Sequence, residues 1–405
     1  MNTKQALYKI KKKLLNMWQL FWLQKQKHKI SRNAKIRIGF LVQMPEVWDS
    51  ESGLYEEFKS RTDCEVVMIV VPPYDFSHSH ISKDYSNNYF LTQYPEAVRA
   101  FDENGEVINI RSLNLDYVFY QRPYDHYLPT DLKSYMMMRY AKCCYIPYGY
   151  SFTDDYAHLL VNPLFYPSLY FAFPASENTL KIMEKPVLKR INQGLQHFEY
   201  LGYPPFEPFL ELQKPQQSRV KTVLWTPRWS YNSRIGGSHF FEYKDYFLEL
   251  NNIYPELKCV FRPHPMMFEE FEKKGLMSAQ DISDFISLIE SNGIDYDHGI
   301  PVLESFKKTD LLITDISAIM IPFFITGRPM IYCDSGCSFS EAEKDLQECI
   351  YIARNLDELK YYVKEIERGN DYLFEKRQAL IRREFSKSED SVKRIARRIM
   401  KDFEE

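Results

Sequence analysis

The sequence lacks the short motifs that mark the commonest nucleotide and metal chemistries. Residues 36–42 read as the first strand of a Rossmann-like domain, but Gly39 stands alone and no Gly-x-Gly-x-x-Gly follows, which argues against a bound dinucleotide. There is no Gly-x-x-x-x-Gly-Lys-Ser/Thr and no Gly-x-Ser-x-Gly, so neither a P-loop NTPase nor an α/β-hydrolase is indicated. No His, Asp or Glu cluster has metal-ligand spacing, and we expect neither a metal nor a cofactor.

Paired cysteines and long apolar runs are also missing. The seven cysteines are odd in number and scattered, and no Cys-x-x-Cys occurs, which predicts reduced structural thiols of a cytosolic protein. The apolar centre at residues 14–23 is only about ten residues long, too short to span a bilayer. No small-residue cleavage site of a signal peptide follows it.

Charge is concentrated at one end of the chain. Residues 1–34 hold nine Lys or Arg and no acid, which leaves 43 basic against 55 acidic residues elsewhere, so the body is not a nucleic-acid surface. Trp18, Phe21 and Trp22 lie between two lysine clusters, a pattern typical of a basic amphipathic helix on an anionic membrane surface. The alternative is a helix packed on its own domain with solvated lysines. We favour the membrane surface.

Short apolar runs that end in polar turns recur along the rest of the chain and predict two α/β domains, for which 405 residues suffice. We expect strands at residues 36–42, 65–71, 117–120, 143–146, 222–225, 258–261, 311–313 and 330–333. We expect helices at residues 54–61, 89–101, 240–250, 268–275, 281–290, 318–325 and 356–368.

Four prolines between residues 204 and 219 mark the best interdomain linker. The predicted organisation is a basic membrane-surface segment (1–34), an N-terminal Rossmann-like domain (35–207), a linker (208–219), a C-terminal Rossmann-like domain (220–385) and an amphipathic C-terminal helix (386–405).

Residues 309–334 form the clearest βαβ unit. The apolar run 311–313 is followed by Thr314, Asp315 and Ser317, then by an apolar stretch, Gly327 and a second apolar run. The polar turn lies at the carboxyl end of a strand, where open α/β sheets bind ligands and a helix N-terminus attracts phosphate. The alternative is that Asp315 and Ser317 only cap the helix.

Other strands of the second half also end in polar residues. Thr226 and Arg228 follow the run 222–225, and Arg262 and His264 follow the run 258–261. Parallel strands end on one edge of a sheet, so these side chains are expected to converge. Two prolines stiffen the backbone around His264, and an Arg beside a His suits phosphate binding. The alternative is a rigid turn with a surface histidine.

Arg262-Pro-His-Pro265, Asp310-Leu-Leu-Ile-Thr-Asp-Ile-Ser317 and Gly327-Arg-Pro329 together resemble the CDP-glycerol glycerophosphotransferase family. Its enzymes build teichoic-acid and capsule polymers at the inner face of bacterial membranes. Trp225-Thr-Pro-Arg-Trp229 is similar to the start of the family's nucleotide-binding domain. Tyr120-Gln-Arg-Pro-Tyr-Asp125 and Tyr145-Ile-Pro-Tyr-Gly149 resemble one branch of the group.

The resemblance covers roughly residues 36–400. It implies two Rossmann-like domains facing a cleft (the GT-B type), with the nucleotide on the C-terminal domain and the acceptor in the cleft. It also implies transfer without a metal.

The sequence departs from the family pattern in two places. Better-known members have a His-Gly pair thought to supply the general base, where this chain has Tyr148-Gly149; the nearby substitutes are Asp125, His126, Asp154 and Asp155. The usual Thr-Asp-Tyr-Ser-Ser is Thr-Asp-Ile-Ser-Ala at residues 314–318. This difference leaves CDP-ribitol or another nucleotide-linked polyol phosphate open as the donor.

The resemblance implies a peripheral enzyme on the cytoplasmic face of the bacterial cell membrane. It would move a polyol phosphate from CDP-glycerol, or a related CDP-polyol, to a hydroxyl of a glycan or lipid-linked polymer and release CMP. The expected catalytic residues are His264, Asp154 and Asp155, and the expected substrate-binding residues are Arg262, Thr226, Arg228, Thr314, Asp315, Ser317, Tyr148 and Gly149. Two alternatives remain: a GT-B glycosyltransferase that uses a nucleotide sugar in capsule or lipooligosaccharide assembly, and a non-catalytic membrane-bound scaffold.

Overall fold

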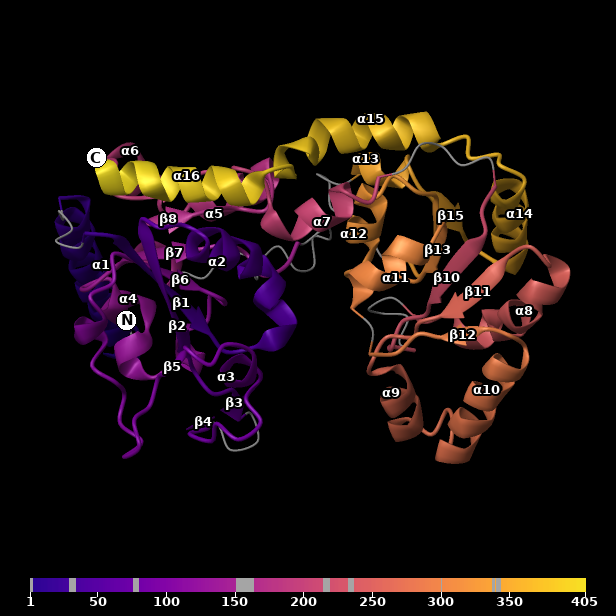
Figure 1. Ribbon diagram of the computed structural model, residues 1–405, viewed down its shortest axis with the longest axis horizontal. Helices are drawn as coiled ribbons and strands as arrows, with labels where there is room; N and C mark the ends of the chain where they lie inside the picture. Colours follow the sequence, from indigo (N-terminus) through magenta and orange to yellow (C-terminus); the bar gives the residue numbers. More distant parts are fainter. Residues whose placement is uncertain are drawn as a thin grey trace. The chain divides into compact units, whose positions relative to one another are not determined.

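The computed structural model describes residues 3–28, 34–75, 80–150, 164–213, 219–231, 237–299, 301–336, 339 and 344–405. The chain forms two compact units. Of the described residues, unit 1 contains those up to 205 together with 390–405, and unit 2 contains those from 206 to 389. Each unit is built on its own parallel sheet (Figure 1).

Unit 1 has a seven-stranded sheet in the order β5-β2-β1-β6-β7-β8-β9, with every pair parallel. The strands are β1 (Ile36–Val42), β2 (Cys64–Val70), β5 (Val98–Arg99), β6 (Tyr117–Tyr120), β7 (Lys142–Tyr145), β8 (Phe171–Ala172) and β9 (His197–Phe198). A separate antiparallel pair joins β3 (Tyr74–Asp75) to β4 (His80–Ile81). The strand order reverses between β1 and β6, as in doubly wound sheets.

The helices of unit 1 include one that comes from the end of the chain. They are α1 (Thr3–Lys27), α2 (Ser52–Lys59), α3 (Tyr89–Gln93), α4 (Ser134–Met137), α5 (Glu177–Glu184), α6 (Leu188–Asn192) and α16 (Ser391–Glu404). Short 3₁₀ turns are η1 (Pro45–Ser50), η2 (Ile110–Leu113), η3 (Asp125–Tyr127), η4 (Thr130–Leu132) and η6 (Tyr166–Ser168). Figure 1 draws α16 in yellow among the indigo and magenta elements of unit 1, and α16 packs against α2.

A buried carboxylate fastens α16 to unit 1. Asp402 Oδ2 accepts hydrogen bonds from Lys142 Nζ and from the Tyr117 hydroxyl, both at 2.6 Å. The side chains of Asp402 and Lys142 are 8% and 10% exposed. Since the charged pair is shielded from water, losing one partner would leave the other buried and unpaired.

Helix α1 packs Gln19, Leu23 and Gln26 against the rest of unit 1. Gln19 Nε2 donates to Ser168 Oγ at 2.9 Å, and Gln26 Nε2 donates to the Met138 carbonyl at 2.9 Å. On the opposite side, the apolar side chains of Ile10, Leu14, Met17 and Phe21 are 57%, 60%, 57% and 50% exposed. No helix in the part of the chain that the structure describes is long and apolar enough to cross a membrane.

Unit 2 has a six-stranded parallel sheet in the order β12-β11-β10-β13-β14-β15. Its strands are β10 (Thr222–Thr226), β11 (Lys258–Phe261), β12 (Asp295–Tyr296), β13 (Leu311–Thr314), β14 (Met330–Cys333) and β15 (Tyr351–Ala353). In chain order this is 3-2-1-4-5-6, the order of the Rossmann fold, with its reversal between β10 and β13. The expected α/β class with two Rossmann-like domains is confirmed.

Helices cover the sheet of unit 2 and bury an aromatic core. They are α7 (Glu207–Leu210), α8 (Phe240–Ile253), α9 (Met267–Lys273), α10 (Ala279–Ser291), α11 (Val302–Lys308), α12 (Met320–Ile325), α13 (Lys344–Gln347), α14 (Leu356–Glu367) and α15 (Phe374–Glu384), with the 3₁₀ turns η7 (Pro204–Phe206) and η10 (Ser386–Ser388) nearby. Trp225 of β10 stacks on Phe247 of α8, with ring centroids 4.0 Å apart. This contact holds α8 against the sheet beside the carboxyl end of β10.

The strand predictions are confirmed. Strands β1, β6, β11 and β14 have the predicted bounds, β10 and β13 are one residue longer at the carboxyl end, and β2 and β7 begin and end one residue earlier than predicted. The helix predicted over residues 89–101 is wrong. Helix α3 ends at Gln93, and residues 98–99 form the edge strand β5. The reason is local: Pro95 disfavours helical backbone at Tyr94, which has φ −127° and ψ 80°.

The βαβ unit at residues 309–334 is present, but its helix begins late. Helix α12 begins at Met320, its N-cap is Ile319, and no side chain caps it. The alternative in which Asp315 and Ser317 serve as helix caps is therefore wrong. The two residues lie in the turn between β13 and α12.

Candidate functional site

The candidate site in unit 2 lies where the strand order of its sheet reverses. Thr226 ends β10 and Thr314 ends β13, and these strands are neighbours. Arg262 and His264 follow β11, which pairs with the other side of β10. The predicted convergence of these strand ends on one edge is therefore seen, at the position where doubly wound sheets bind ligands.

Asp315 organises this edge. Its carboxylate is 3% exposed. Oδ2 accepts from the backbone N–H of Arg228 at 2.8 Å and from Ser238 Oγ at 3.3 Å, and Oδ1 accepts from His239 Nδ1 at 2.7 Å. The sequence analysis expected Asp315 to bind substrate, whereas both of its oxygens contact protein donors. It fastens the loop after β10 to the loop after β13.

His239 is a candidate that the sequence analysis missed. It precedes α8, and its ring stacks on Tyr243 with centroids 5.1 Å apart. Burial lowers the pKa of His239, but the hydrogen bond to Asp315 and its negative charge outweigh burial, so the pKa is raised above its ordinary value. His239 Nε2 has no partner among the described residues, and the surroundings of the imidazole favour its charged form.

His264 is held in the opposite protonation state. Its Nδ1 accepts a hydrogen bond from the backbone N–H of Met266 at 3.2 Å, which requires an unprotonated Nδ1. Burial and the neighbouring Arg228 lower the pKa of His264. The site thus holds two imidazoles whose surroundings move their pKa values apart, an arrangement that suits separate proton-transfer roles.

The two arginines of this edge differ in their partners. Arg262 Nη1 donates to both oxygens of Asp297 at 3.0 Å and to Ser305 Oγ at 2.9 Å, so this expected phosphate ligand is engaged by a buried carboxylate. Arg228 Nη1 donates to the Ile316 carbonyl at 2.8 Å, and its Nε is buried without a partner. Among the described residues no acidic side chain forms an ion pair with Arg228, which leaves its charge available to an anion.

The hydroxyl residues are mostly turned inward. Thr226 and Thr314 are buried, and Thr314 Oγ1 donates to the Asp315 carbonyl at 2.7 Å. Ser317 is half-buried, with its Oγ 3.3 Å from Thr314 Oγ1. Of the three expected ligands, Ser317 alone presents a partly accessible hydroxyl.

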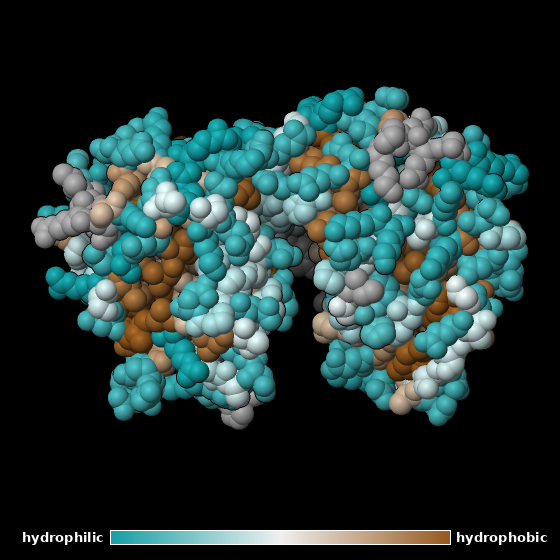
Figure 2. Space-filling model, viewed as in Figure 1, coloured by the Kyte–Doolittle hydropathy of each residue, from teal (hydrophilic) through white to brown (hydrophobic). Residues whose placement is uncertain are grey.

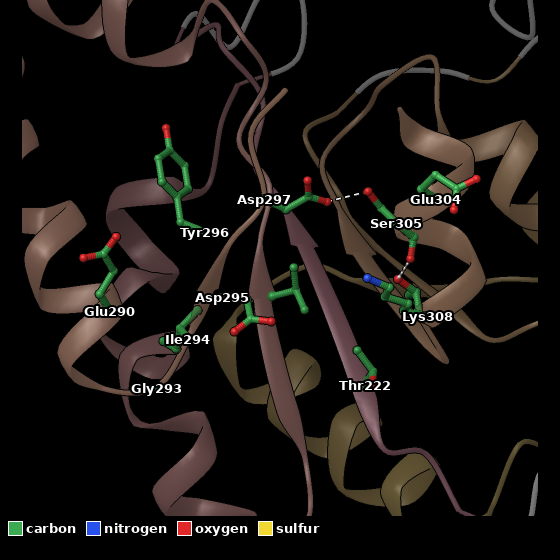
Figure 3. A pocket seen from close by; sticks show the side chains of 12 residues that line it. Thr222, Glu290, Gly293, Ile294, Asp295, Tyr296, Asp297, Glu304, Ser305 and Lys308 are labelled. Atoms are coloured by element: carbon green, nitrogen blue, oxygen red, sulfur yellow. Dashed lines mark hydrogen bonds between the residues drawn. The ribbon is translucent and has the colours of Figure 1, made fainter. Parts of the chain in front are cut away.

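A cavity of about 460 Å³ lies beside the edge strand β12 (Figure 3). Its charged lining consists of Glu290, Asp295, Asp297, Glu304 and Lys308. Ser305 hydrogen-bonds Asp297 there at 2.5 Å. Because four carboxylates face one ammonium group, this cavity does not suit a phosphate. The lining includes Thr222 at the start of β10 and Thr309 shortly before β13, whereas the candidate site lies at the carboxyl ends of these strands.

The expected residues of the first half meet at the carboxyl edge of unit 1. Tyr148 and the exposed Gly149 follow β7, and the Tyr148 hydroxyl lies 2.9 Å from that of Tyr124. Burial raises the pKa of Tyr148, so it stays protonated and serves as a hydrogen-bond donor. Asp125 is unsuited as the base because its two oxygens accept from the N–H and hydroxyl of Ser134, at 2.7 and 2.8 Å.

Asp154 and Asp155 lie outside the described residues. Within the described ranges, no group of three or more His, Cys, Asp and Glu side chains is arranged to hold a metal ion.

Residues 210–401 match the model of a protein family described as CDP-Glycerol:Poly(glycerophosphate) glycerophosphotransferase. No curated protein sequence matches this chain. The matched region contains nearly the whole of unit 2, including Arg228, His239 and His264. The family resemblance expected from the sequence is therefore confirmed.

Solved structures with the same fold span most of the chain. A variant of the wall teichoic acid polymerase TagF is 12% identical, with a TM-score of 0.54 over 99% of this chain and 97% of that one. A TagF variant soaked with CDPG is 14% identical, with a TM-score of 0.53 and the same coverage. UDP-GlcNAc 2-epimerase from Neisseria meningitidis, bound to UDP-GlcNAc, is 10% identical, with a TM-score of 0.58 over 90% and 100%. These likenesses support the fold, and the expected GT-B class is confirmed.

Proposed function

Because residues 210–401 belong to the CDP-glycerol glycerophosphotransferase family, we propose that the protein transfers a polyol phosphate from CDP-glycerol, or a related CDP-polyol, to an acceptor hydroxyl. The observation that carries this proposal is the group formed by Arg228, His239 and His264 at the strand reversal of unit 2. Those residues lie inside the matched region and combine an unpaired cation with two imidazoles of opposite pKa shift.

The acceptor oxygen attacks the β-phosphorus of the donor, and the bond from that phosphorus to the bridging oxygen breaks. CMP leaves with the electron pair, and the hydroxyl proton passes to a base. Negative charge builds on the non-bridging oxygens and on CMP, so positioned donors provide most of the rate enhancement. Arg228 and protonated His239 would supply charge, while neutral His264 would donate from Nε2.

Ser317 would add a hydroxyl donor to the same phosphate. Thr226, Thr314 and Asp315 would act by holding the two loops, since their side chains are buried. Arg262 would position the loop after β11 through Asp297. This division of roles refines the expectation that all of these residues contact the donor.

The base is proposed to come from unit 1. Asp154 and Asp155 remain candidates from the sequence. His126 is a further one: it is exposed, and burial together with the charge of Arg122 lowers its pKa, so the imidazole is neutral and able to accept a proton at pH 7. Replacement of His126, Asp154 and Asp155 one at a time by Asn identifies the base as the change that abolishes turnover without weakening donor binding.

We also propose that α1 seats the protein on an anionic membrane surface, at the cytoplasmic face, where a glycan or lipid-linked polymer would be extended. Ile10, Leu14, Met17 and Phe21 are spaced four, three and four residues apart, which places them on one helix face. Figure 2 shows apolar surface on unit 1 in the region where Figure 1 draws α1 and α4. An exposed apolar stripe beside exposed lysines is the pattern of an interfacial helix.

A donor screen tests the proposed reaction. Purified protein is supplied with CDP-glycerol, CDP-ribitol and nucleotide sugars, and the released nucleotide is identified. Release of CMP from a CDP-polyol supports the proposal, whereas UDP release from a nucleotide sugar contradicts it. His264→Ala and His239→Asn should each abolish or strongly reduce turnover, and His80→Asn, an exposed histidine on β4 of unit 1, should not.

A further inference from the structure

Unit 1 carries a cation at the strand reversal of its own sheet. Gln43 follows β1, and Gln121 and Arg122 follow β6. Arg122 Nη2 donates to Gln43 Oε1 at 2.5 Å, and no acidic side chain of the described residues forms an ion pair with Arg122. Its guanidinium is half-buried, and Glu46 is the acidic residue that acts on it from a greater distance. An anion is the partner that such a group lacks.

The backbone donors at this position are already occupied. Gln121 Oε1 accepts from the N–H groups of Gln43 and Met44, both at 2.8 Å, and Gln121 Nε2 donates to the Met44 carbonyl at 2.7 Å. In dinucleotide-binding domains the backbone at the first strand–helix turn approaches the pyrophosphate. Here the Gln121 side chain occupies those backbone groups, so they are not available to an anion. The guanidinium of Arg122 is the group that can bind an anion at this edge.

Tyrosines surround the guanidinium. The Arg122 Cζ lies 5.8 Å from the ring centroid of Tyr124 and 5.1 Å from that of Tyr127. The hydroxyls of Tyr124 and Tyr148 lie 2.9 Å apart. One hydroxyl proton of this pair makes the bond between them, and the other remains free to donate. Burial raises the pKa of Tyr148, which keeps it a donor.

We propose that Arg122, Tyr124 and Tyr148 form a binding site for a phosphate ester of the acceptor. Arg122 Nη2 gives one of its two N–H groups to Gln43. Its other N–H, together with the parallel N–H of Nη1 or of Nε, offers two donors to two phosphate oxygens, and the tyrosine pair offers a donor to a third. The acceptor hydroxyl would then belong to a molecule that already carries a phosphate. Naming this molecule the acceptor rests on the proposed transferase function; the anion site itself does not.

Binding of sn-glycerol 3-phosphate to the full-length protein tests the site, with CDP at saturation to occupy the donor site. Calorimetric titration should detect binding by the native protein, and Arg122→Gln should weaken it roughly tenfold or more because a charge-assisted hydrogen-bond pair is lost. Tyr148→Phe should weaken it by a smaller factor. Arg122→Lys should retain part of the affinity, and thermal melts establish that each variant is folded.

Arg139→Gln is the matched control. Arg139 is also half-buried and lies over a tyrosine, with its Cζ 4.8 Å from the Tyr140 ring centroid. Arg139 precedes β7 and so lies at the amino ends of the strands, whereas Arg122 lies at their carboxyl ends. Replacement of Arg139 should therefore leave the affinity for glycerol 3-phosphate unchanged. Equal affinity of native protein and folded Arg122→Gln overturns the proposal, as does equal affinity for glycerol and for glycerol 3-phosphate.

Turnover separates this inference from the proposed function. With a phosphate-bearing acceptor, Arg122→Gln should raise the acceptor KM roughly tenfold or more and leave the donor KM unchanged. With an uncharged hydroxyl acceptor, the acceptor KM of the variant should equal that of the native protein. CMP release with an unchanged KM for the phosphate-bearing acceptor overturns the site but keeps the function. Arg122-dependent binding of glycerol 3-phosphate without turnover of any donor keeps the site but contradicts the function.

Discussion

Replacement of Asp315 by Asn tests how the candidate site sets the protonation of His239. The native carboxylate accepts from the Arg228 backbone and Ser238 through Oδ2 and from His239 through Oδ1. Asparagine can keep the first two contacts with its carbonyl oxygen. Its amide NH₂ then faces His239 Nδ1, which must give up its proton and become an acceptor.

The size of the expected effect on kcat follows from the hydrogen bond between His239 and Asp315. A hydrogen bond to a charged group contributes about 1.5–3 kcal/mol, which is roughly a tenfold to hundredfold effect. In Asp315→Asn the hydrogen bond and the charge that raise the His239 pKa most strongly disappear, and only the weaker raising influences of Glu242 and Asp334 remain. Burial, the largest single cause, still lowers the pKa, which should therefore fall below its ordinary value of 6.5. If the imidazolium stabilises the departing CMP, kcat at pH 7 should fall roughly tenfold to hundredfold.

Two assays check this reasoning. NMR titration follows the His239 ring protons with pH, and CMP release at pH 6 to 9 gives the rate. Ser238→Ala is the control, because it removes a neutral 3.3 Å contact to Asp315 without changing the charge. A His239 pKa that stays above 6.5 in folded Asp315→Asn refutes the electrostatic argument. Full activity of a variant whose His239 pKa has fallen refutes the role of the imidazolium.

The stability of the Asp315→Asn variant should depend on pH in a defined direction. His239 has a raised pKa in the folded protein, so its contribution is fully present below pH 6.5 and is lost as pH rises through the folded pKa. The loss of unfolding free energy should therefore be larger at pH 6 than at pH 9, in urea titrations at both values.

Three further predictions concern unit 1. Glu51 is fully buried, neither of its carboxylate oxygens has a hydrogen-bond partner among the described residues, and burial raises its pKa well above 4.5. Because the carboxyl of the unfolded chain ionises above that pH and the folded one resists ionisation, Glu51→Gln should be more stable than the native protein at pH 8 in urea unfolding, with the gain vanishing near pH 4.5. Asp402→Ala should lower the free energy of unfolding by about 3–5 kcal/mol, because Lys142 is left buried and unpaired. The double variant Asp402→Leu with Lys142→Met should recover most of this loss, and a double variant as unstable as Asp402→Ala would contradict the ion-pair argument. Met17→Glu with Phe21→Glu should weaken binding to anionic phospholipid vesicles roughly a hundredfold or more in flotation assays, since two side chains worth about 1.5–3 kcal/mol each no longer enter the interface. Gln93→Glu, at an exposed position of α3 rather than of α1, should change the binding little.

The apolar runs and the polar turns that follow them were sufficient to predict the two α/β domains and most of their strands. A strand buried on both faces must be a short continuous apolar run, and the runs at 117–120, 258–261 and 330–333 are directly visible. Because parallel strands end on one edge, the residues that follow them were correctly expected to converge, and their motifs carried the family resemblance. The helix expected at residues 89–101 is wrong because Pro95 disfavours helical backbone at the residue before it, so α3 ends at Gln93.

Which of those residues are available to a ligand and which hold the protein together depends on contacts between distant parts of the chain. Asp315 and His239 are 76 residues apart, and Arg262 and Asp297 are 35 apart, so no local pattern links them. Side-chain pairing depends on how loops from different strands meet, whereas periodicity reports only on burial within a short window. For the same reason the return of α16 to unit 1, and the unpaired charge of Arg122 beside its tyrosines, appear only in the folded chain.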